Sequence, residues 1–264
     1  MKLAREERFS KWIVEVRTIS TFYVKNNQVN SETISLIGDD VKHIRNVLRH
    51  KVDDELEICD ESGFRYLTKI REFLENEILL EILEQSEKNT EMPVKIDLYQ
   101  GLPKSDKMDL IVQKTTELGV STIIPVITER VIVKLEKGNE NKKIERWNKI
   151  ATEAAKQSGR QLIPVVENVA NLEKIVEKLS KYDIVIVPFE CEKDSTLKNI
   201  LKNVKNKIEN IAVVIGPEGG FSEKDIATLE KSSNVVKVSL GKRILRTETA
   251  GLATIAMLLY EYEL

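Results

Sequence analysis

The stretch "VVIGPEGGFSEKD", Val213–Asp225, decides the fold of the C-terminal part of this chain. Apolar residues lead directly into Gly216–Gly220, where three of five residues are glycine, and a polar segment follows at once. Ser222 and Asp225 have the spacing of a capping box, in which each side chain bonds the other residue's backbone N–H at the start of a helix. The stretch therefore predicts a strand, a glycine-rich loop and a helix N-terminus, in that order.

The same order of strand and helix recurs from residue 94 to the end. Apolar strands are predicted at 94–100, 121–127, 183–189, 211–216 and 235–240, and amphipathic helices at 105–118, 139–158, 194–207, 222–231 and 247–262. Near-continuous apolar strands between helices are typical of a parallel sheet that is buried on both faces. We therefore predict an α/β domain over residues 94–264, with Thr247 capping its last helix and with ligands at the carboxyl edge of the sheet.

Residues 21–88 have a different character. Short segments of β-rich composition follow one another there, and Asp60–Gly63 has the composition of a hairpin turn. One helix is predicted at Asp39–His50, with Val41, Ile44 and Leu48 as its apolar stripe. This part predicts a small barrel or curled sheet, and residues 1–20 precede it as an extension of uncertain origin.

The composition excludes several classes of protein. The chain has 264 residues, of which 41% are apolar and 32% charged, with a net charge of −2, and this balance is that of a soluble globular protein. No apolar run approaches the roughly 20 residues that span a bilayer, and the first residues lack the apolar segment of a secretory signal. Two distant cysteines and two histidines predict neither a disulfide framework nor a metal site. We expect a cytoplasmic protein without metal or membrane partner.

The glycine-rich segment does not match the common phosphate-binding motifs. Neither G-x-x-x-x-G-K-[ST] nor G-x-G-x-x-G is present, and Glu218 would repel a phosphate. Its backbone suits a cationic or hydrogen-bonding ligand better, although any one glycine can equally serve a structural turn. A second loop, Leu240–Arg246, combines three cations with apolar Ile244 and Leu245, which suits an adenine ring. The alternative for its arginines is a solvated surface charge.

Together, "VVIGPEGGFSEKD" and "VSLGKRILRTETA" resemble the last two motifs of the SPOUT methyltransferases. More narrowly, they resemble the RsmE family, which methylates N3 of a uridine in small-subunit ribosomal RNA. The segments "LPKSDKMDLIVQKTTELGVSTIIPV", "RWNKIATEAAKQSGRQLIPVV" and "HIRNVLRHKVDDELEICD" are similar to that family too, so the resemblance covers about residues 20–264. It implies a SPOUT domain with a deep trefoil knot at 94–264 and a PUA-like RNA-binding β-barrel domain at 21–88.

The resemblance also implies a cofactor, S-adenosylmethionine, bound in a bent form largely through backbone groups. The residues it places around the cofactor are Pro188, Ile215, Gly216, Pro217, Gly219, Gly220, Leu240, Gly241, Ile244, Leu245 and Arg246. Arg246 is the first candidate for stabilising the uridine anion, and Arg243 is the second. Glu218 is a candidate general base, with a structural hydrogen-bonding role in its loop as the alternative.

For the RNA, the sequence offers cations in both parts of the chain. The candidate RNA contacts are Lys42, Arg45, Arg49, Arg160 and Arg243. The first three follow helical spacing in a segment without acids, although residues 1–90 hold 14 basic and 18 acidic side chains. Arg160 can instead be a surface charge at a helix end. The expected partners are small-subunit ribosomal RNA, within an assembled subunit, and a second copy of the chain. The alternative function is a non-catalytic RNA-binding protein with a knotted nucleotide-binding domain.

Overall fold

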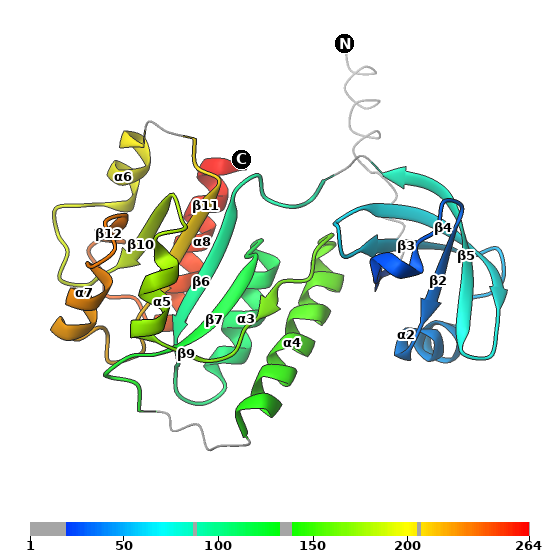
Figure 1. Ribbon diagram of the computed structural model, residues 1–264, viewed down its shortest axis with the longest axis horizontal. Helices are drawn as coiled ribbons and strands as arrows, with labels where there is room; N and C mark the ends of the chain where they lie inside the picture. The colour runs from blue at the N-terminus through cyan, green and yellow to red at the C-terminus, as the bar shows by residue number, and fades with distance from the viewer. Residues whose placement is uncertain (1–19, 87–88, 133–138, 205–206, 264) are drawn as a thin grey trace, which may run out of the picture. The chain divides into compact units, whose positions relative to one another are not determined.

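The computed structural model describes residues 20–86, 89–132, 139–204 and 207–263 (Figure 1). The chain divides into two compact units, Met1–Lys88 and Asn89–Leu264. The predicted N-terminal extension lies outside the described residues, apart from Ser20. No helix in the described ranges combines the length and the apolar character that crossing a membrane requires.

The first unit is a curled five-stranded sheet. Its strands are β1 (Thr21–Val24), β2 (Thr33–Ile37), β3 (Glu55–Asp60), β4 (Arg65–Phe73) and β5 (Glu77–Ser86). They are ordered β1-β3-β4-β5-β2, with β1 parallel to β3 and the other pairs antiparallel. Along β2, buried Ile34 and Leu36 alternate with residues that are partly or fully exposed, and the two buried residues join a single core. The turn between β3 and β4 is the predicted one, because the Gly63 N–H donates to the Asp60 carbonyl at 3.0 Å.

The predicted helix Asp39–His50 differs in form from a regular α-helix. One α-helical turn, α2 (Asp39–Lys42), continues as a π-helical segment, η2 (His43–Leu48). Val41 and Ile44 are buried as expected, but Leu48 is 39% exposed, so its place in the apolar stripe was wrong. The wider turn of a π-helix explains the difference, since it rotates later residues away from the face that helical spacing predicts.

The second unit is built on a parallel sheet ordered β12-β10-β11-β6-β7-β8, with short β9 pairing β7 (Figure 1). Its strands are β6 (Lys95–Gly101), β7 (Thr122–Ile127), β8 (Val165–Val166), β9 (Ala170–Asn171), β10 (Ile184–Pro188), β11 (Asn210–Ile215) and β12 (Val235–Val238). Its helices are α3 (Lys107–Glu117), α4 (Asn139–Ser158), α5 (Leu172–Leu179), α6 (Leu197–Asn203), α7 (Glu223–Leu229) and α8 (Thr247–Tyr262). The predicted α/β class is confirmed.

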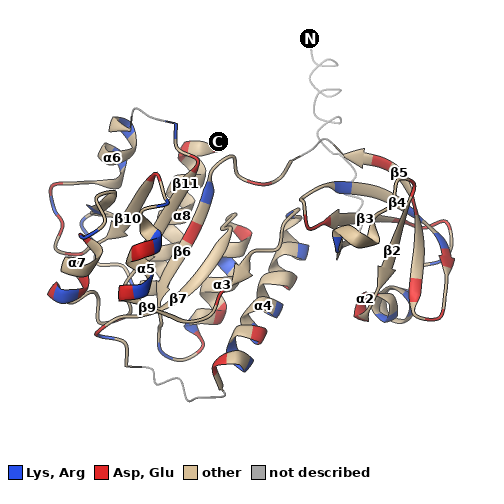
Figure 2. Cartoon of the chain, in the orientation of Figure 1, with Lys and Arg blue, Asp and Glu red and all other residues tan. Residues whose placement is uncertain are grey.

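Helices cover both faces of this sheet. Along β11, Val213 and Ile215 pack in one core with residues of α3, α4, α6 and α8, whereas Ala212 and Val214 pack in another with residues of α5 and α7. Figure 2 shows charged residues concentrated on the helices, while β7, β10 and β11 carry none. This burial on both faces explains why the strands read as continuous apolar runs.

Three local expectations have different outcomes. The capping box at Ser222 and Asp225 is confirmed, with both reciprocal bonds present. Thr247 does not cap α8, because Arg246 occupies the N-cap position and the Thr247 hydroxyl bonds the loop after β11 instead. Helix α5 was not expected, although Leu172, Ile175 and Leu179 are buried at helical spacing and could have revealed it. The deep trefoil knot stays a prediction.

Candidate functional site

Three loops leave one edge of the large sheet from adjacent strands. Strand β10 lies between β11 and β12, and both pairs are parallel, so their carboxyl ends and following loops lie side by side. Pro188 and Ile215 are the last residues of β10 and β11. We call Gly216–Gly220, which follows β11, the glycine loop, and Leu240–Arg246, near the end of β12, the arginine loop. This edge gathers the segments that the motif analysis identified.

Backbone approaches are very close around the glycine loop. Gly220 has φ +67°, and a Cβ there would lie 2.9 Å from Glu190 Oε1 in the loop after β10. A Cβ on Gly101, the last residue of β6, would lie 2.6 Å from the backbone nitrogen of Pro217. Real Cβ atoms essentially never come so near, so the glycine loop packs directly on the end of β6. Gly101 and Gly220 therefore allow close packing, and Gly220 also provides the turn geometry.

Side chains from elsewhere hold the loops. The Thr247 hydroxyl donates to the carbonyl of Gly216 at 2.6 Å, and Arg130 Nη1 donates to the carbonyl of Gly219 at 2.9 Å. The Ser239 N–H donates to the Ser195 carbonyl at 2.7 Å, which joins the segment after β12 to the segment after β10. The sequence analysis missed Arg130, and its only signal was a lone cation soon after a predicted strand.

Glu218 is the acidic residue of the glycine loop, and two lysines hold it. The Lys104 N–H donates to Glu218 Oε1 at 3.0 Å, and Lys107 Nζ lies 3.1 Å from the same oxygen. Lys107 Nζ also lies 3.3 Å from Glu248 Oε2 in the first turn of α8. One ammonium group thus connects the glycine loop to the helix that follows the arginine loop. Neither lysine was a candidate in the sequence analysis, because both lie in the earlier "LPKSDKMD" segment.

These contacts bear on the two interpretations of Glu218. Burial acts to raise its pKa, but backbone hydrogen bonds and the Lys107 ammonium lower it by more, so the pKa of Glu218 lies below its usual value. A carboxylate with a lowered pKa is ionised at neutral pH and is a weak proton acceptor. The geometry favours the structural hydrogen-bonding role over the role of general base.

The arginine loop leaves its cations accessible. Arg243 and Arg246 are exposed, and neither guanidinium has a hydrogen-bond or ion-pair partner among the described residues. The carbonyl of Arg246 accepts from the Ala250 N–H at 2.8 Å, so the backbone of Arg246 is fixed at the start of α8 while its side chain stays available. Ile244 is 86% exposed, which is unusual for an isoleucine, and Gly241 has φ +118° three residues after the end of β12.

The three cations of the first unit have different environments. Arg45 stacks on the ring of Phe73 with its Cζ 5.4 Å from the centroid, and it donates to the carbonyl of Leu74. Lys42 and Arg49 are exposed and have no such partner in the described part of the chain. Lys42 ends α2, Arg45 lies within the π-helical η2 and Arg49 is the left-handed C-cap of η2, so the spacing of a regular α-helix does not relate the three.

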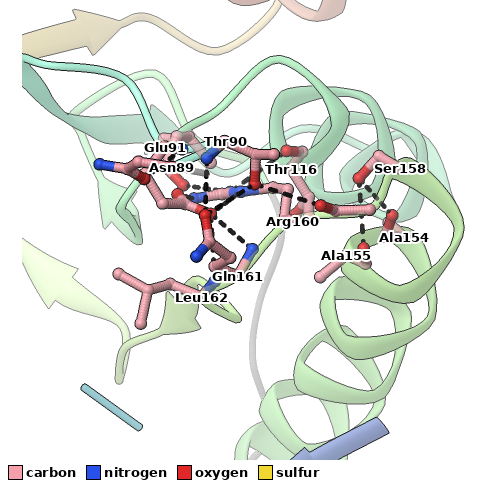
Figure 3. Close-up of polar contacts among 12 residues, drawn as sticks. Asn89, Thr90, Glu91, Thr116, Ala154, Ala155, Ser158, Arg160, Gln161 and Leu162 are labelled. Carbon is pink, nitrogen blue, oxygen red and sulfur yellow. Dashed lines mark hydrogen bonds and ion pairs between the residues drawn. The ribbon is translucent and has the colours of Figure 1, made fainter. Parts of the chain in front are cut away.

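Arg160 is a buried residue, which differs from both sequence-based interpretations (Figure 3). It is 5% exposed, and its guanidinium pairs with Glu91 Oε2 at 2.5 Å and donates to the Val120 carbonyl at 2.7 Å. Glu91 Oε1 also accepts from the backbone N–H groups of Gln161 and Leu162. A buried pair of this kind needs such additional bonds to be tolerated. Arg160 therefore anchors residue 91 to the end of α4 and is occupied within its own chain.

Histidine, cysteine and carboxylate side chains do not gather into a metal-binding cluster anywhere in the described ranges. Cys59 is buried, and this burial raises the pKa of its thiol to about 11. Cys191 is exposed in the loop after β10.

Comparison with known proteins agrees with this architecture. Residues 90–259 match the model of an RNA methyltransferase domain, and residues 36–83 match that of an RNA methyltransferase PUA domain. The ribosomal RNA small subunit methyltransferase E of Bacillus subtilis is 35% identical over 88% of this chain and 91% of its own length. That of Aquifex aeolicus is 36% identical over 90% of this chain and 98% of its own.

A solved structure is similar over nearly the same range. It is the ribosomal RNA small subunit methyltransferase E of Neisseria gonorrhoeae bound to S-adenosyl methionine, with a TM-score of 0.80 and 31% identity. The alignment covers 92% of this chain and 98% of that one. An α/β domain with this loop edge, joined to a PUA domain, defines an RNA methyltransferase. The chain belongs to the ribosomal RNA small subunit methyltransferase E family, as its motifs predicted.

Proposed function

We propose that this protein is an S-adenosylmethionine-dependent methyltransferase that modifies N3 of a uridine in 16S ribosomal RNA. The observation that carries the proposal is the loop edge of the large sheet, where the glycine loop packs on β6 and the arginine loop leaves Arg246 accessible. The similarity over most of the chain to relatives named ribosomal RNA small subunit methyltransferase E supports methylation of small-subunit ribosomal RNA, and the choice of N3 of a uridine rests on the motif resemblance. We expect the enzyme to act in the cytoplasm.

The residues at this edge suit S-adenosylmethionine. Backbone groups of the glycine and arginine loops can hold its polar parts, because Gly220 adopts a left-handed conformation and the glycines carry no Cβ over that backbone. The exposed apolar side chain of Ile244 offers a surface for the adenine ring. The proposed contact set is Pro188, Ile215, Gly216, Pro217, Gly219, Gly220, Leu240, Gly241, Ile244, Leu245 and Arg246.

The cofactor supplies an electrophilic methyl group on a positively charged sulfur. For N3 of uridine to accept it, the imide proton must leave, and negative charge then spreads onto the two neighbouring carbonyl oxygens. The guanidinium of Arg246 is positioned by a fixed backbone and can stabilise that charge. Glu218 keeps the glycine loop in place through Lys104 and Lys107. Because these contacts engage the Glu218 carboxylate, we propose that the imide proton leaves to bulk solvent, where hydroxide or buffer accepts it, and that the Arg246 cation favours its loss by lowering the pKa of the bound uridine.

We propose that the RNA is held by cations of both units. In the first unit, Lys42 and Arg49 are exposed and can contact phosphates, and in the second unit Arg243 can contact RNA beside the cofactor site. Arg45 supports the segment through Phe73 and is a positioning residue. Arg160 is left out of the set because its guanidinium is buried in an ion pair. The substrate base must be unpaired or swung out to expose N3.

We further propose that the protein works as a homodimer on an assembled subunit, with the deep trefoil knot that its sequence motifs imply. Helices α3 and α8 pack together, and apolar side chains on both remain exposed. Leu110 is 43% exposed, Met257 42% and Tyr260 71%. Apolar residues on neighbouring helices are the composition that a subunit interface buries.

The function is tested by mass spectrometry of ribosomal RNA. A strain that lacks the gene should lose the methyl group at N3 of one 16S uridine and regain it when the gene is restored. Purified protein with S-adenosylmethionine should methylate small subunits from that strain. The proposal would be contradicted if the deletion strain kept the same methylation pattern as wild type and the purified protein transferred no methyl group in vitro.

Cofactor binding should not depend on a metal. Calorimetry with S-adenosylmethionine is expected to give one site per chain, with the same affinity in EDTA and in added Mg²⁺, because the proposed contact set contains no histidine, cysteine or carboxylate side chain that could hold a metal. Binding that appears only after a divalent ion is added would contradict the proposed contact set.

Removing two cations of the first unit should weaken RNA binding through electrostatics. For Lys42→Ala/Arg49→Ala, we expect the slope of log affinity against log salt to fall by about 0.7 to 0.9 for each phosphate that the variant no longer neutralises. The affinity for S-adenosylmethionine should not change. Lys25→Ala, which removes an exposed lysine elsewhere in the same unit, is the control. An unchanged slope would make Lys42 and Arg49 solvated surface charges.

A further inference from the structure

A buried chain of hydrogen bonds runs from β6 through α8 to the glycine loop. Gln100 Nε2 donates to Thr247 Oγ1 at 2.9 Å and to the Gly101 carbonyl at 3.0 Å, and the Thr247 hydroxyl donates to the Gly216 carbonyl at 2.6 Å. Gln100 is fully buried and Thr247 is 6% exposed. None of the motif-derived candidates includes Gln100, and Thr247 was expected only as a helix cap.

The direction of each bond follows from the chemistry of its ends. The carbonyl of Gly216 can only accept, so the single hydroxyl proton of Thr247 must point to it. The oxygen of Thr247 then accepts, which requires the amide NH₂ of Gln100 rather than its oxygen. The carbonyl of Gly101 requires the same orientation, because it too can only accept. The two carbonyls therefore determine the orientation of the Gln100 amide and of the Thr247 hydroxyl.

The chain of bonds joins three segments that are far apart in the sequence. Gln100 belongs to the end of β6, Gly216 begins the glycine loop, and Thr247 follows Arg246 directly. A Cβ on Gly251, one turn into α8, would lie 3.4 Å from Gln100 Oε1, so the helix backbone also lies close to this side chain. A substitution at Thr247 is therefore expected to disturb both the glycine loop and the backbone of Arg246.

The side-chain oxygen of Gln100 indicates that these hydrogen bonds do more than stabilise the fold. Gln100 Oε1 is buried without a hydrogen-bond partner in the described part of the protein. Burying an unpaired polar atom is unfavourable, and an apolar side chain would avoid this cost. Unlike an apolar residue, Gln100 donates a hydrogen bond to the Thr247 hydroxyl, and that hydroxyl in turn donates to the Gly216 carbonyl.

We propose that Gln100 and Thr247 are positioning residues that hold the glycine loop in its cofactor-binding shape. The proposal rests on the proposed function, since it concerns the same cofactor site. The two residues act through the carbonyl of Gly216 and need not contact the cofactor. Loss of the hydroxyl leaves that carbonyl without this donor and frees the loop to change shape.

The test compares three variants by calorimetry with S-adenosylmethionine. Thr247→Val keeps the shape of the side chain and removes the hydroxyl, and we expect the affinity to fall by about tenfold, which corresponds to about 1.4 kcal/mol. Thr247→Ser restores the donor and should bind within about twofold of wild type. Thr254→Val is the matched control, because Thr254 is a buried threonine of the same helix whose hydroxyl donates only to the Ala250 carbonyl. Its affinity should equal that of wild type.

A second measurement separates positioning from general destabilisation. Gln100→Leu should weaken binding, and in the double variant with Thr247→Val the two losses should not add, because both act through one chain of bonds. Thermal unfolding of every variant checks that it folds. Wild-type affinity in folded Thr247→Val, or equal losses in Thr247→Val and Thr254→Val, would overturn the proposal. If the wild-type protein itself does not bind S-adenosylmethionine, the proposed function is what fails.

Discussion

Arg246→Lys is expected to slow the methyl-transfer step by about ten- to thousandfold, which is comparable to the loss of one well-placed oxyanion donor. Lysine keeps the positive charge but loses the planar fork that can meet the uridine carbonyl oxygens. Because the Arg246 carbonyl holds the start of α8 and the side chain is exposed, the fold and the cofactor affinity should change little. Single-turnover kinetics at saturating RNA and cofactor isolate this step.

The pH dependence of the same variant gives an independent check. Removal of the imide proton becomes easier as pH rises, so the wild-type rate should increase with pH. If Arg246 stabilises the anion, it also lowers the pKa of the bound uridine, and the variant should lag most at low pH. Arg243→Lys is the comparison within the same loop. If Arg246→Lys transfers the methyl group at the wild-type rate and loses only affinity for RNA, then Arg246 binds the RNA and does not stabilise the anion.

Gly220→Val should abolish measurable cofactor binding, a loss of at least about a hundredfold in affinity. Gly220 has φ +67°, and a β-branched residue is a genuine outlier at such an angle. The new Cβ would also lie 2.9 Å from Glu190 Oε1, so the Glu190 carboxylate would have to move, and the larger cost is the backbone strain placed in the glycine loop itself. The first unit should stay folded, since it has its own core. Calorimetry and thermal unfolding measure the two outcomes.

Gly159→Val is a closely matched control for this experiment. Gly159 has φ +68°, nearly the same angle, but a Cβ there would meet nothing within 4 Å. It lies just after α4 and outside the loop edge. The variant should therefore show the cost of the backbone strain without the loss of binding. Equal affinities for S-adenosylmethionine in the two variants would mean that Gly220 is an ordinary turn residue.

The class of the fold followed from local patterns in the sequence. Apolar runs such as Val213–Ile215 predicted buried parallel strands because both faces of this sheet are covered. The boundaries of α4 and α8 were also predictable from apolar spacing and the loop motifs that flank them. Spacing failed at Leu48, since it assumes a regular helix and the chain adopts a π-helical segment there.

The site was predictable only where its residues belong to the two loops. Those loops have recognisable glycines and arginines, but the groups that hold them come from other elements. Lys107 and Arg130 contact the glycine loop directly and Gln100 does so through Thr247, and the motif analysis proposed a site role for none of the three. Arg160 is the opposite case. Its sequence context predicts an exposed charge, but the side chain is buried in an ion pair with Glu91, which is distant in sequence.

The close approach of Gly101 and Pro217 has a consequence for how the enzyme matures. The two residues are far apart in the chain, and their backbones can meet only after β6 has paired with β11. Non-local pairing of this kind is slow, because the entropy of closing a long loop is lost before any contact forms. Helices such as α3 and α4 can form early in folding, and we expect the loop edge to be completed later. A newly made chain is then expected to become competent for catalysis only near the end of its folding.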